Sequence, residues 1–536
     1  MKSSKTDGST AGLSGTFDPR AWGAETRSSE GVPALTILYH PDARRVGDWA
    51  PLHEVPLGRE ALVGRYTPDF SAPDHAAGEP LADRYISRQP VKFAPAPGGG
   101  ILLSLAGSRT RVEEDGVVVT DSREISAAEI ERGVALELAG RIVLLLHRRR
   151  SLPAEPVGRF GLVGESEGLA RVRAEIRRVA DLNVPVLLRG ETGTGKELVA
   201  RAVHDAGPRR SSPFVAVNLA AIPATLVASE LFGSVKGAFT GSVQSQEGYF
   251  RKAHGGTLFL DEVGEAPPEV QVMLLRVLET GELFPVGSQA PTRVDVRVLA
   301  ATDADLEAKV KSGEFRAPLL HRLSGYEVWL PPLRDRREDV GRLFFHFLRQ
   351  ELQAIGESDR LLTDLWVPPG LLARLTRYEW PGNVRQLRNV VRQLVIGSRG
   401  LPRMEVGAAV ERLLSGSGAE RGAGDSSSQL PQVQPHPAPP PASRRKPSEV
   451  SEEELLAALR ANRWDLQATA EQLRISRPSL YALIENSPHV RKAGDLSTEE
   501  IIRCWEVCGG DVNAMVDNLE VSRKALARRL RELKLA

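Results

Sequence analysis

The segment GETGTGKE at residues 190–197 constrains the fold of this chain more than any other feature. It lies between a strand-like run, VPVLL at 184–188, and a helical stretch, ELVARAVHD. A strand, a glycine-rich loop and a helix in this order form the context of a phosphate-binding loop. The glycines free backbone N–H groups to surround phosphate oxygens, and the helix N-terminus adds a positive dipole end. The candidate phosphate-binding residues are Gly190, Glu191, Thr192, Gly193, Thr194, Gly195, Lys196 and Glu197.

A second motif, GGTLFLDE at 255–262, is a buried strand that ends in two carboxylates. Taken alone, these could be two solvated acids. Downstream of a phosphate-binding loop, the pair predicts Asp261 as a Mg²⁺ ligand and Glu262 as the residue that polarises an attacking water. The predicted reaction class is nucleoside triphosphate hydrolysis, in which positioning and charge neutralisation supply most of the catalysis.

The residues around these motifs, about 160–395, are predicted to form an α/β domain with a parallel sheet, because strand-like runs alternate with helical stretches. A further helical stretch spans roughly 336–413. The strand-like runs are 184–188, 214–218, 257–261 and 296–302.

The N-terminal region has a different pattern. Residues 1–30 are rich in Ser, Thr and Gly, and we expect them to be disordered. From about 33 to 150, short apolar runs are separated by turn clusters, which predicts a small β-sandwich or barrel. The runs are ALTILY (34–39), ILLSLA (101–106), GVVVT (116–120) and RIVLLL (141–146).

The C-terminal region begins with a predicted linker at 415–448, rich in Pro, Ser, Gly and Gln. The final segment, 449–536, contains an internal repeat with a period of 46 residues. Each copy reads as a helix, a turn, a short helix and a Ser-capped helix. Two copies are too few for a solenoid, so the repeat predicts tandem helix-turn-helix units. Among the aligned pairs are Glu454 with Glu500, Leu455 with Ile501, Leu473 with Leu519, and Ser476 with Ser522.

Composition narrows the function. The 536 residues contain 70 Lys plus Arg and 69 Asp plus Glu, a net charge of +1. A globally basic DNA-binding coat is therefore excluded, and any nucleic-acid surface must be local. The two cysteines, Cys504 and Cys508, exclude a disulfide-stapled secreted fold. Because the chain has no apolar signal core and no run long enough to cross a bilayer, we expect a cytoplasmic protein without membrane contact.

The stretch SELFGSVKGAFTGS at 229–242 lies between the two nucleotide motifs. On its own it could be a glycine-bounded hydrophobic loop. It resembles the G-A-F-T-G-A insertion of the sigma-54-dependent transcription activators, a family of AAA+ ATPases. The resemblance implies a mobile loop that contacts sigma-54 through Phe239 and Thr240. The matching residues are Gly237, Ala238, Phe239, Thr240 and Gly241, and Ser242 replaces Ala.

The resemblance covers about 160–395 and implies ATP as the nucleotide and Mg²⁺ as its metal. Glu197 stands where other phosphate-binding loops have Ser or Thr, and Glu is normal there in this family. Asn218 takes the place of the Asn that restrains the catalytic Glu. Arg385, in WPGNVRQL at 380–387, corresponds to a second sensor that reads the bound nucleotide in cis.

Arg316 and Arg322, in GEFRAPLLHRL at 313–323, resemble the arginine fingers of the family. Each could otherwise be a solvated surface residue. The resemblance implies that they reach the γ-phosphate of a neighbouring subunit, and hence a homo-oligomeric ring, expected to be a hexamer. Three other residues depart from the family pattern: Asp303 for Asn, Pro318 for Asp, and Pro285 for Arg. Since these departures spare Lys196, Asp261 and Glu262, hydrolysis is expected to survive at a reduced rate.

The region 33–150 resembles a forkhead-associated (FHA) domain, a module that binds phosphothreonine peptides. The resemblance implies that Arg65, Ser87 and Arg88 hold a phosphate and that a phosphothreonine-containing protein is a partner. Pro90 replaces the structural His of that family. A degenerate protein-interaction module is the alternative. The matching segments are LVGRYTPDF (62–70), ISRQP (86–90) and SLAGSRTRVEEDG (104–116).

The second copy of the C-terminal repeat, VSRKALARRLRELK at 521–534, resembles the Fis-type helix-turn-helix more strongly than the first copy. Its basic last helix suits phosphate contacts and the major groove of DNA. A solvated basic helix is the bland alternative. The residues expected at DNA are Ser522, Arg523, Lys524, Arg528 and Arg529.

The predicted protein is therefore a multidomain chain: an FHA-like β-sandwich, an α/β AAA+ P-loop ATPase with a helical subdomain, and an all-α helix-turn-helix region. The resemblance implies an activator that binds upstream DNA and uses ATP turnover to move the 237–242 loop against sigma-54 RNA polymerase. Two alternatives remain: a DNA-binding scaffold or repressor with a vestigial ATP site, favoured by Asp303 and Pro318, and an AAA+ remodeller that acts on other proteins.

Overall fold

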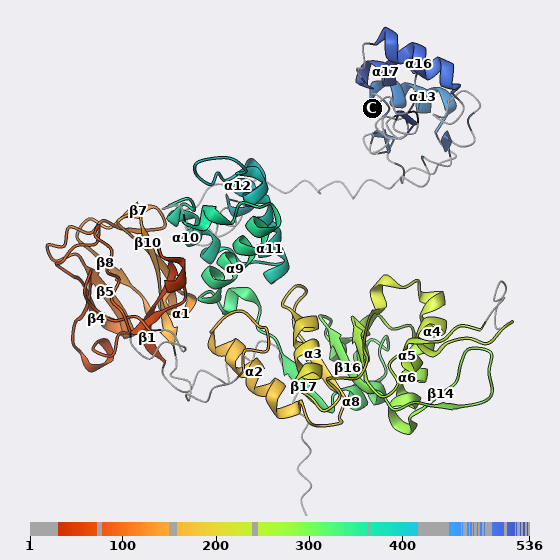
Figure 1. Cartoon of the computed structure of the whole chain (residues 1–536), viewed down its shortest axis with the longest axis horizontal. Helices are drawn as coiled ribbons and strands as arrows, with labels where there is room; N and C mark the ends of the chain where they lie inside the picture. The colour runs from red at the N-terminus through yellow and green to blue at the C-terminus, as the bar shows by residue number, and fades with distance from the viewer. Residues whose placement is uncertain are drawn as a thin grey trace, which may run out of the picture. The chain divides into compact units, whose positions relative to one another are not determined.

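The computed structural model describes residues 31–71, 78–149, 158–237, 245–362, 365–415 and, with internal gaps, 450–533. The chain divides into two compact units, Met1–Gly424 and Asp425–Ala536 (Figure 1). The predicted disordered stretch 1–30 and nearly all of the predicted linker 415–448 lie outside the described residues. Across the described part of the chain, no helix combines the length and the apolar character that crossing a bilayer requires.

The first unit begins with a β-sandwich of two antiparallel sheets, in agreement with the turn-separated apolar runs (Figure 1). One sheet has the strand order β2-β1-β10-β9-β6-β7 and the other has the order β3-β4-β5-β8. A helical turn, α1 (Ala127–Arg132), is started by a capping box in which Ser126 and Glu129 bond to each other's backbone. The strands are β1 (Val32–Tyr39), β2 (Trp49–Pro51), β3 (Ala61–Val63), β4 (Val91–Ala96), β5 (Gly100–Ser104), β6 (Val112–Glu114), β7 (Val117–Val118), β8 (Ser122–Ile125), β9 (Val134–Leu138) and β10 (Ile142–Arg149).

The larger sheet is buried on both of its faces, which explains its unbroken apolar sequence. On β10, Ile142, Leu144 and Leu146 belong to the core between the two sheets. The alternate residues, Val143 and Leu145, belong to a second core formed with helices further along the chain. An antiparallel strand with one solvated face would instead alternate apolar and polar residues.

The centre of the unit is a five-stranded parallel sheet with the order β12-β13-β16-β11-β17. Four strands match the predicted runs, and β17 was not anticipated. Helices α2 and α3 bury apolar side chains against the sheet in one hydrophobic core. Helices α4, α5, α6 and α8 do so in a second hydrophobic core. The strands are β11 (Val186–Arg189), β12 (Phe214–Asn218), β13 (Thr257–Asp261), β16 (Arg297–Thr302) and β17 (Tyr326–Trp329), with a hairpin of β14 (Glu282–Leu283) and β15 (Thr292–Arg293). The helices are α2 (Glu167–Val179), α3 (Lys196–Asp205), α4 (Ala224–Phe232), α5 (Tyr249–Lys252), α6 (Pro268–Thr280), α7 (Leu306–Lys311) and α8 (Ala317–Leu323).

A helical subdomain, residues 333–415, follows the sheet. Its core surrounds Trp380, which is fully buried and donates its indole N–H to the Leu375 carbonyl at 2.8 Å. The helices are α9 (Asp339–Ala354), α10 (Pro369–Arg377), α11 (Asn383–Gly397) and α12 (Ala408–Ser415), with short 3₁₀ turns at Leu333–Asp335 and Ser358–Leu362.

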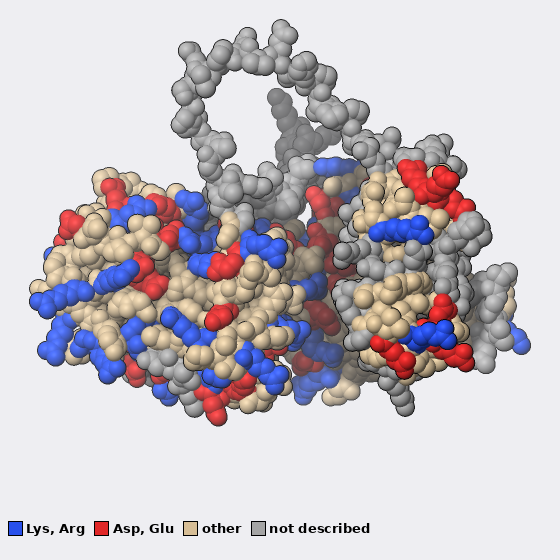
Figure 2. Space-filling model, turned by 90° about the horizontal axis from the view of Figure 1, so that it is seen from above, with Lys and Arg blue, Asp and Glu red and all other residues tan. Residues whose placement is uncertain are grey.

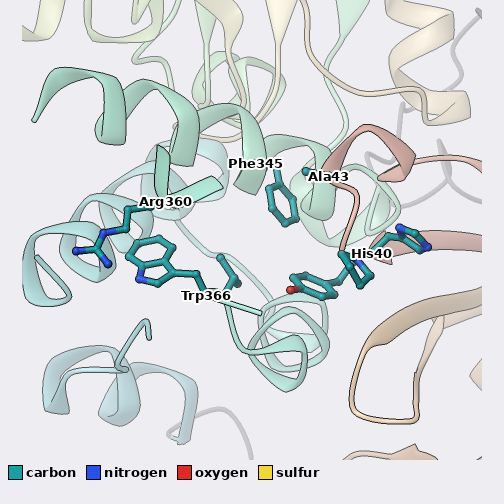
Figure 3. A pocket seen from close by; sticks show the side chains of 8 residues that line it. His40, Ala43, Phe345, Arg360 and Trp366 are labelled. Atoms are coloured by element: carbon teal, nitrogen blue, oxygen red, sulfur yellow. The ribbon is translucent and has the colours of Figure 1, made fainter. Parts of the chain in front are cut away.

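The β-sandwich and the helical subdomain share one hydrophobic core. The rings of Tyr39 on β1 and Phe345 on α9 have centroids 6.0 Å apart. An ion pair joins Arg377, at the end of α10, to Asp115 in the β6–β7 turn. A small pocket of about 20 Å³ lies at this junction, bordered by His40, Phe345, Arg360 and Trp366 (Figure 3). A volume of that size holds about one water molecule, so the two parts are closely packed.

The N-terminus of α9 is a polar junction. The Asp339 carboxylate accepts from the Glu165 N–H at 2.6 Å, the Ser166 N–H at 3.0 Å and the Ser166 hydroxyl at 2.5 Å. Arg149, the last residue of β10, donates to the Glu165 carbonyl at 3.1 Å. The β-sandwich, the chain entering the α/β domain and the helical subdomain therefore meet at Asp339.

The second unit is helical and preserves the 46-residue repeat. Ser451 caps α13 (Glu452–Ala461) and Ser497 caps α16 (Thr498–Val507), each accepting from the N–H of the third helical residue. A further helix is α17 (Val512–Leu519). The repeat partners Leu455 and Ile501 are both buried in one core, so the two copies fold against each other.

Candidate active site

The carboxyl ends of three neighbouring strands bring the candidate residues together. The phosphate-binding loop follows β11, Asp261 and Glu262 end β13, and Asp303 follows β16. Because β16 lies between β13 and β11, Asp303 stands between the other two groups. This is the edge at which parallel α/β sheets bind ligands.

The loop itself has the backbone that its glycines predict. Gly193 and Gly195 have φ values of +80° and +107°, in the left-handed region that favours glycine. Lys196 is the first residue of α3 and only 6% exposed. Its ammonium donates to the Gly190 carbonyl at 2.8 Å and lies 3.9 Å from a Glu262 carboxylate oxygen. The cation is thus held at the loop, in the position from which it can meet phosphate oxygens.

The side chains of Glu191 and Thr194 in the loop form hydrogen bonds within the protein. The Glu191 carboxylate accepts two bonds from Arg334, at 2.8 and 2.6 Å, and these hold its pKa below the usual range. Glu197 is exposed on the first turn of α3. The loop hydroxyl of Thr194 is buried and donates to the Glu191 carbonyl at 2.8 Å. Glu191 therefore ties the loop to the helical subdomain rather than facing a ligand.

Asp261 and Glu262 have different surroundings. Asp261 is paired in register with Asn218 on β12, and the Asn218 amide donates to its carboxylate at 3.0 Å. The Asn218 side chain thus donates to the candidate metal ligand and accepts the Ala221 N–H at 3.2 Å, whereas the resemblance implied a contact with Glu262. Glu262 has a left-handed φ of +54° and is half-buried. Burial raises its pKa, and the Lys196 ammonium partly offsets the rise.

Asp303 links the two motifs. Thr192, in the phosphate-binding loop, donates its hydroxyl to the Asp303 carboxylate. The Asp303 backbone N–H points to a Glu262 carboxylate oxygen at 3.4 Å. The Thr192 bond lowers the pKa of Asp303, so this carboxyl is ionised at neutral pH.

The turn that carries the second sensor motif lies against the loop. The Arg385 N–H donates to the Gly193 carbonyl at 3.3 Å. A Cβ at Gly193 would stand 2.4 Å from the Gly382 carbonyl oxygen, so only glycine fits there. Asn383 is fully buried and donates to the Glu191 carboxylate at 3.0 Å and to the Thr192 carbonyl at 3.1 Å.

Sequence reasoning missed Asn383, Arg334 and Arg336 as supports of the loop. Arg336 is buried and donates to the Thr194 carbonyl at 3.2 Å. The run LRDRRED at 333–339 offered only a charge-rich signal, and such runs usually mark a solvated face. The polar residue Asn383 in the WPGN turn was the one sequence signal that could have pointed to a support of the loop.

The two candidate arginine fingers lie at opposite ends of one short helix, α8. Arg316 caps α8, and Arg322 lies in its last turn; both are exposed. Arg322 donates to the Leu278 carbonyl at 2.9 Å. Pro318 lies in the first turn of α8, where a helix needs no backbone N–H, so this departure is sterically harmless.

The candidate sigma-54 contact, Ala238 to Ser242, lies outside the described residues, and Gly237 is the last described residue before it. The segment leaves and rejoins the domain at one point, because Ser234 and Gln246 exchange backbone bonds at 3.0 and 2.9 Å. Of the candidate DNA-binding residues, Ser522, Arg523, Lys524 and Arg528 lie outside the described residues, and Arg529 is half-buried.

The structure brings the three candidate phosphopeptide residues into one loop region of the β-sandwich. Arg65 donates to the Ile86 carbonyl at 2.8 Å and also to the Arg84 carbonyl. The Ser87 hydroxyl accepts the Gln89 N–H at 3.1 Å, and Arg88 is exposed. Arg65 therefore supports the backbone of the loop that presents Ser87 and Arg88.

A cavity of about 460 Å³ runs along the exposed side of α3. It is lined by Phe160 and Gly161 from the preceding segment and by Leu198, Arg201 and Asp205 from the helix. Elsewhere, the face of the molecule in Figure 2 mixes Lys and Arg with Asp and Glu, in keeping with the net charge of +1.

Three family models match the chain. A model described as a sigma-54 interaction domain matches residues 162–329, and one described as an AAA+ ATPase lid domain matches 334–406. A model of the Fis family of bacterial regulatory proteins matches 446–483. The sequence predicts the stronger resemblance in the second copy of the repeat, but this match falls on the first copy.

The curated relatives include the DNA-binding transcriptional regulator NtrC of Escherichia coli K12, which is 49% identical over 239 residues. That alignment covers 45% of this chain and 50% of NtrC, so the chain spans about half the length of the NtrC relatives it matches. The nitric oxide reductase transcription regulator NorR1 of Cupriavidus necator is 39% identical over 356 residues, covering 66% of this chain and 68% of NorR1. Among solved structures, NtrX from Brucella abortus in complex with ADP matches 70% of each chain at 30% identity, with a TM-score of 0.44. The chain belongs to the sigma-54-dependent transcription activators, a family of AAA+ ATPases.

Proposed function

We propose that this chain is a DNA-bound transcription activator that hydrolyses ATP to remodel the closed complex of sigma-54 RNA polymerase. The observation that carries the proposal is the meeting of Lys196, Asp261 and Glu262 at one edge of the parallel sheet, with the Lys196 ammonium 3.9 Å from Glu262. A buried ammonium, a metal-binding carboxylate and a second carboxylate beside a glycine-rich loop are the groups that phosphoryl transfer needs.

Each residue has a distinct role in the proposal. Lys196 binds the β- and γ-phosphates, and backbone N–H groups of the loop bind the rest. Asp261 is the ligand for Mg²⁺, a metal that prefers oxygen and is held in such sites by one or two carboxylates. The fit is good because one Asp261 oxygen is fixed by Asn218 at 3.0 Å while the side chain stays half-exposed at the sheet edge. When bound, Mg²⁺ neutralises phosphate charge.

Glu262 orients the attacking water and accepts its proton. Its pKa is raised by burial, which makes the carboxylate a stronger base than an exposed Glu. The cavity along α3 receives the nucleoside, because Leu198, on its lining, lies beside the loop, 4.0 Å from where a Cβ at Gly195 would stand.

The proposal includes a ring of identical chains, expected to be a hexamer. Arg316 and Arg322 are exposed on α8 and act on the nucleotide of a neighbouring subunit. The loop at 237–242 carries the motion to sigma-54. The backbone bonds between Ser234 and Gln246 join the two ends of the loop, and the bonds of Val286 with Gly233 and Val235 tie this base to the ATPase domain, which supports this role.

The flanking parts supply location and control. We assign DNA binding at an upstream site to the C-terminal repeat, with Ser522, Arg523, Lys524, Arg528 and Arg529 at the DNA. We assign the β-sandwich to an FHA-like sensor that binds a phosphothreonine-containing protein through Arg65, Ser87 and Arg88. The support is the exposure of Arg88 beside Ser87 in a loop held by Arg65. The protein is expected to act in the cytoplasm.

The test is ATP hydrolysis by the full chain over a concentration series, with Arg316→Ala and Arg322→Ala measured beside it. Turnover per chain should rise steeply with concentration and fall by at least about 100-fold in both variants, because each removes a charge that stabilises the transition state. Arg210→Ala is the matched control: Arg210 is exposed but precedes β12, at the opposite edge of the sheet, so this variant should behave as the unchanged protein.

A second assay separates hydrolysis from coupling. Thr240→Ala should hydrolyse ATP normally yet fail to activate transcription from a sigma-54 promoter in vitro. Full activation by this variant would remove the 237–242 loop from the mechanism. A DNA-binding scaffold with a vestigial ATP site is the competing function, favoured by the extra carboxylate of Asp303 beside Glu262; absence of turnover by the full chain at every concentration, with DNA binding retained, would support it.

A further inference from the structure

Asp303 brings an additional negative charge to the catalytic edge of the sheet. It directly follows β16, the strand that separates β13 from β11, so its side chain reaches the phosphate-binding loop on one side and Glu262 on the other. Thr192 donates its hydroxyl to the Asp303 carboxylate, and the Asp303 N–H lies 3.4 Å from a Glu262 oxygen.

The charges at this edge do not balance. Asp261, Glu262 and Asp303 contribute three carboxylates, whereas Lys196 is the cation that lies among them. Two guanidinium groups also contact the loop: Arg334 already forms two bonds to Glu191, and Arg336 donates to the Thr194 carbonyl. A bound nucleotide adds more negative charge, and a triphosphate adds more than a diphosphate. Mg²⁺, when bound by Asp261, would offset part of this charge there, whereas Asp303 follows the next strand, β16.

We propose that Asp303 is a specificity-determining residue for the charge of the bound nucleotide: its carboxylate weakens the binding of ATP relative to ADP, and Thr192 limits this repulsion because its hydroxyl donates a hydrogen bond to the carboxylate. The inference rests on the proposed ATPase function and adds a property to the same site. The site therefore favours ADP, the product of hydrolysis, over ATP. A high ratio of ATP to ADP is then needed for ATP to occupy the sites of the ring.

The first experiment measures affinity in the full chain with Mg²⁺ present. The probes are adenylyl-imidodiphosphate, a triphosphate that is not hydrolysed, and ADP. Asp303→Asn keeps the shape and the acceptor for Thr192 but removes the charge. We expect its affinity for the triphosphate to rise about tenfold and its affinity for ADP to change by less than about threefold, the effect of one unit charge near a partly solvated site. The rise should shrink in high salt.

Thr192→Val supplies the second variant, because it removes the hydrogen bond and keeps the Asp303 charge. Its affinity for the triphosphate should fall, and its affinity for ADP should fall less. The double variant with Asp303→Asn should match the single Asp303→Asn variant within about twofold, since Thr192 acts through Asp303. A purely structural role would lower both affinities together and leave their ratio unchanged.

The outcomes separate the inference from the function on which it rests. An unchanged ratio in Asp303→Asn, or a ratio shifted towards ADP as a metal ligand would give, overturns the inference while nucleotide binding stands. A full chain that binds neither nucleotide overturns both the inference and the proposed function.

Discussion

Gly341 of α9 lies directly against the Leu38 carbonyl of β1: a Cβ at position 341 would stand 2.5 Å from that oxygen. The atoms around this point are backbone on both sides, so neither can move aside without moving an element. The approach of the β-sandwich to the helical subdomain is thus set by the absence of one side chain.

Gly341→Ala should therefore weaken the junction. The clash costs about 1–3 kcal/mol, and the better helix propensity of Ala returns at most about 1 kcal/mol. We expect a lower free energy of unfolding and faster amide hydrogen exchange in both β1 and α9. Gly397→Ala is the control, because Gly397 ends α11 with open space at its Cβ; unchanged exchange in β1 and α9 of Gly341→Ala would contradict the packing described.

Lys196→Ala and Glu262→Gln should fail in different ways. Lys196→Ala removes the ammonium at the loop and should abolish nucleotide binding. Glu262→Gln keeps the fold of the site and should bind ATP while losing hydrolysis by about 100-fold or more, the usual contribution of a general base. Nucleotide binding and phosphate release measured on each variant separate the two, and the assignment of the site fails if both variants still hydrolyse ATP.

Glu338 should make stability depend on pH. It precedes α9, where burial and the neighbouring Asp339 charge raise the pKa of its carboxyl to about 7. A raised carboxyl pKa means that the folded chain binds the proton more tightly. The stabilisation is complete below the unfolded value of about 4.5 and is lost as pH rises through about 7. The loss is on the order of 3 kcal/mol, because each pKa unit corresponds to about 1.4 kcal/mol.

The variant Glu338→Gln should remove this contribution, so that the free energy of unfolding falls less, or rises more, between pH 4.5 and 7 than in the unchanged chain. Denaturant titrations at several pH values measure it. Glu269→Gln, at an exposed position of α6, should leave the pH dependence of the unchanged chain intact. An equally steep dependence in Glu338→Gln would show that another group is responsible.

Asn383→Ala should loosen the phosphate-binding loop. The side-chain oxygen of Asn383 accepts the Leu333 N–H at 2.8 Å, and its side-chain NH₂ donates to the Glu191 carboxylate and the Thr192 carbonyl. Buried groups left without partners cost about 1–3 kcal/mol each. We expect weaker nucleotide binding together with lower stability, measured by titration and thermal unfolding. Gln393→Ala, exposed on the same helix, should change neither.

Sequence reasoning went furthest where chemistry requires particular residue types at fixed spacing. Gly190, Lys196, Asp261 and Glu262 could be placed at one edge of a sheet because a parallel topology brings strand ends together. The 46-residue repeat likewise predicted equivalent buried positions, such as Leu455 and Ile501. Both patterns are local or periodic, so they are visible in a single sequence.

Other features depend on contacts between distant segments. The bonds from Arg334, Arg336 and Asn383 to the loop join residues more than a hundred positions apart, and no local pattern reports them. Strand β17, with the short sequence YEVW, was missed because four residues carry little periodicity. The unbroken apolar run IVLLL indicates that both faces of the larger sheet are buried, but it does not show which elements cover the second face.

The core shared by the β-sandwich and the helical subdomain limits which N-terminal domains can be exchanged in such a protein. Leu38, Tyr39, Val143 and Leu145 cover apolar side chains of α9 and α10, and exposing each large one to water costs about 1.5–3 kcal/mol. A chimaera that exchanged residues 31–149 for an unrelated sensor would strip this cover from the helical subdomain. We therefore expect that a substitution on one side of the junction can be tolerated only with a complementary substitution on the other.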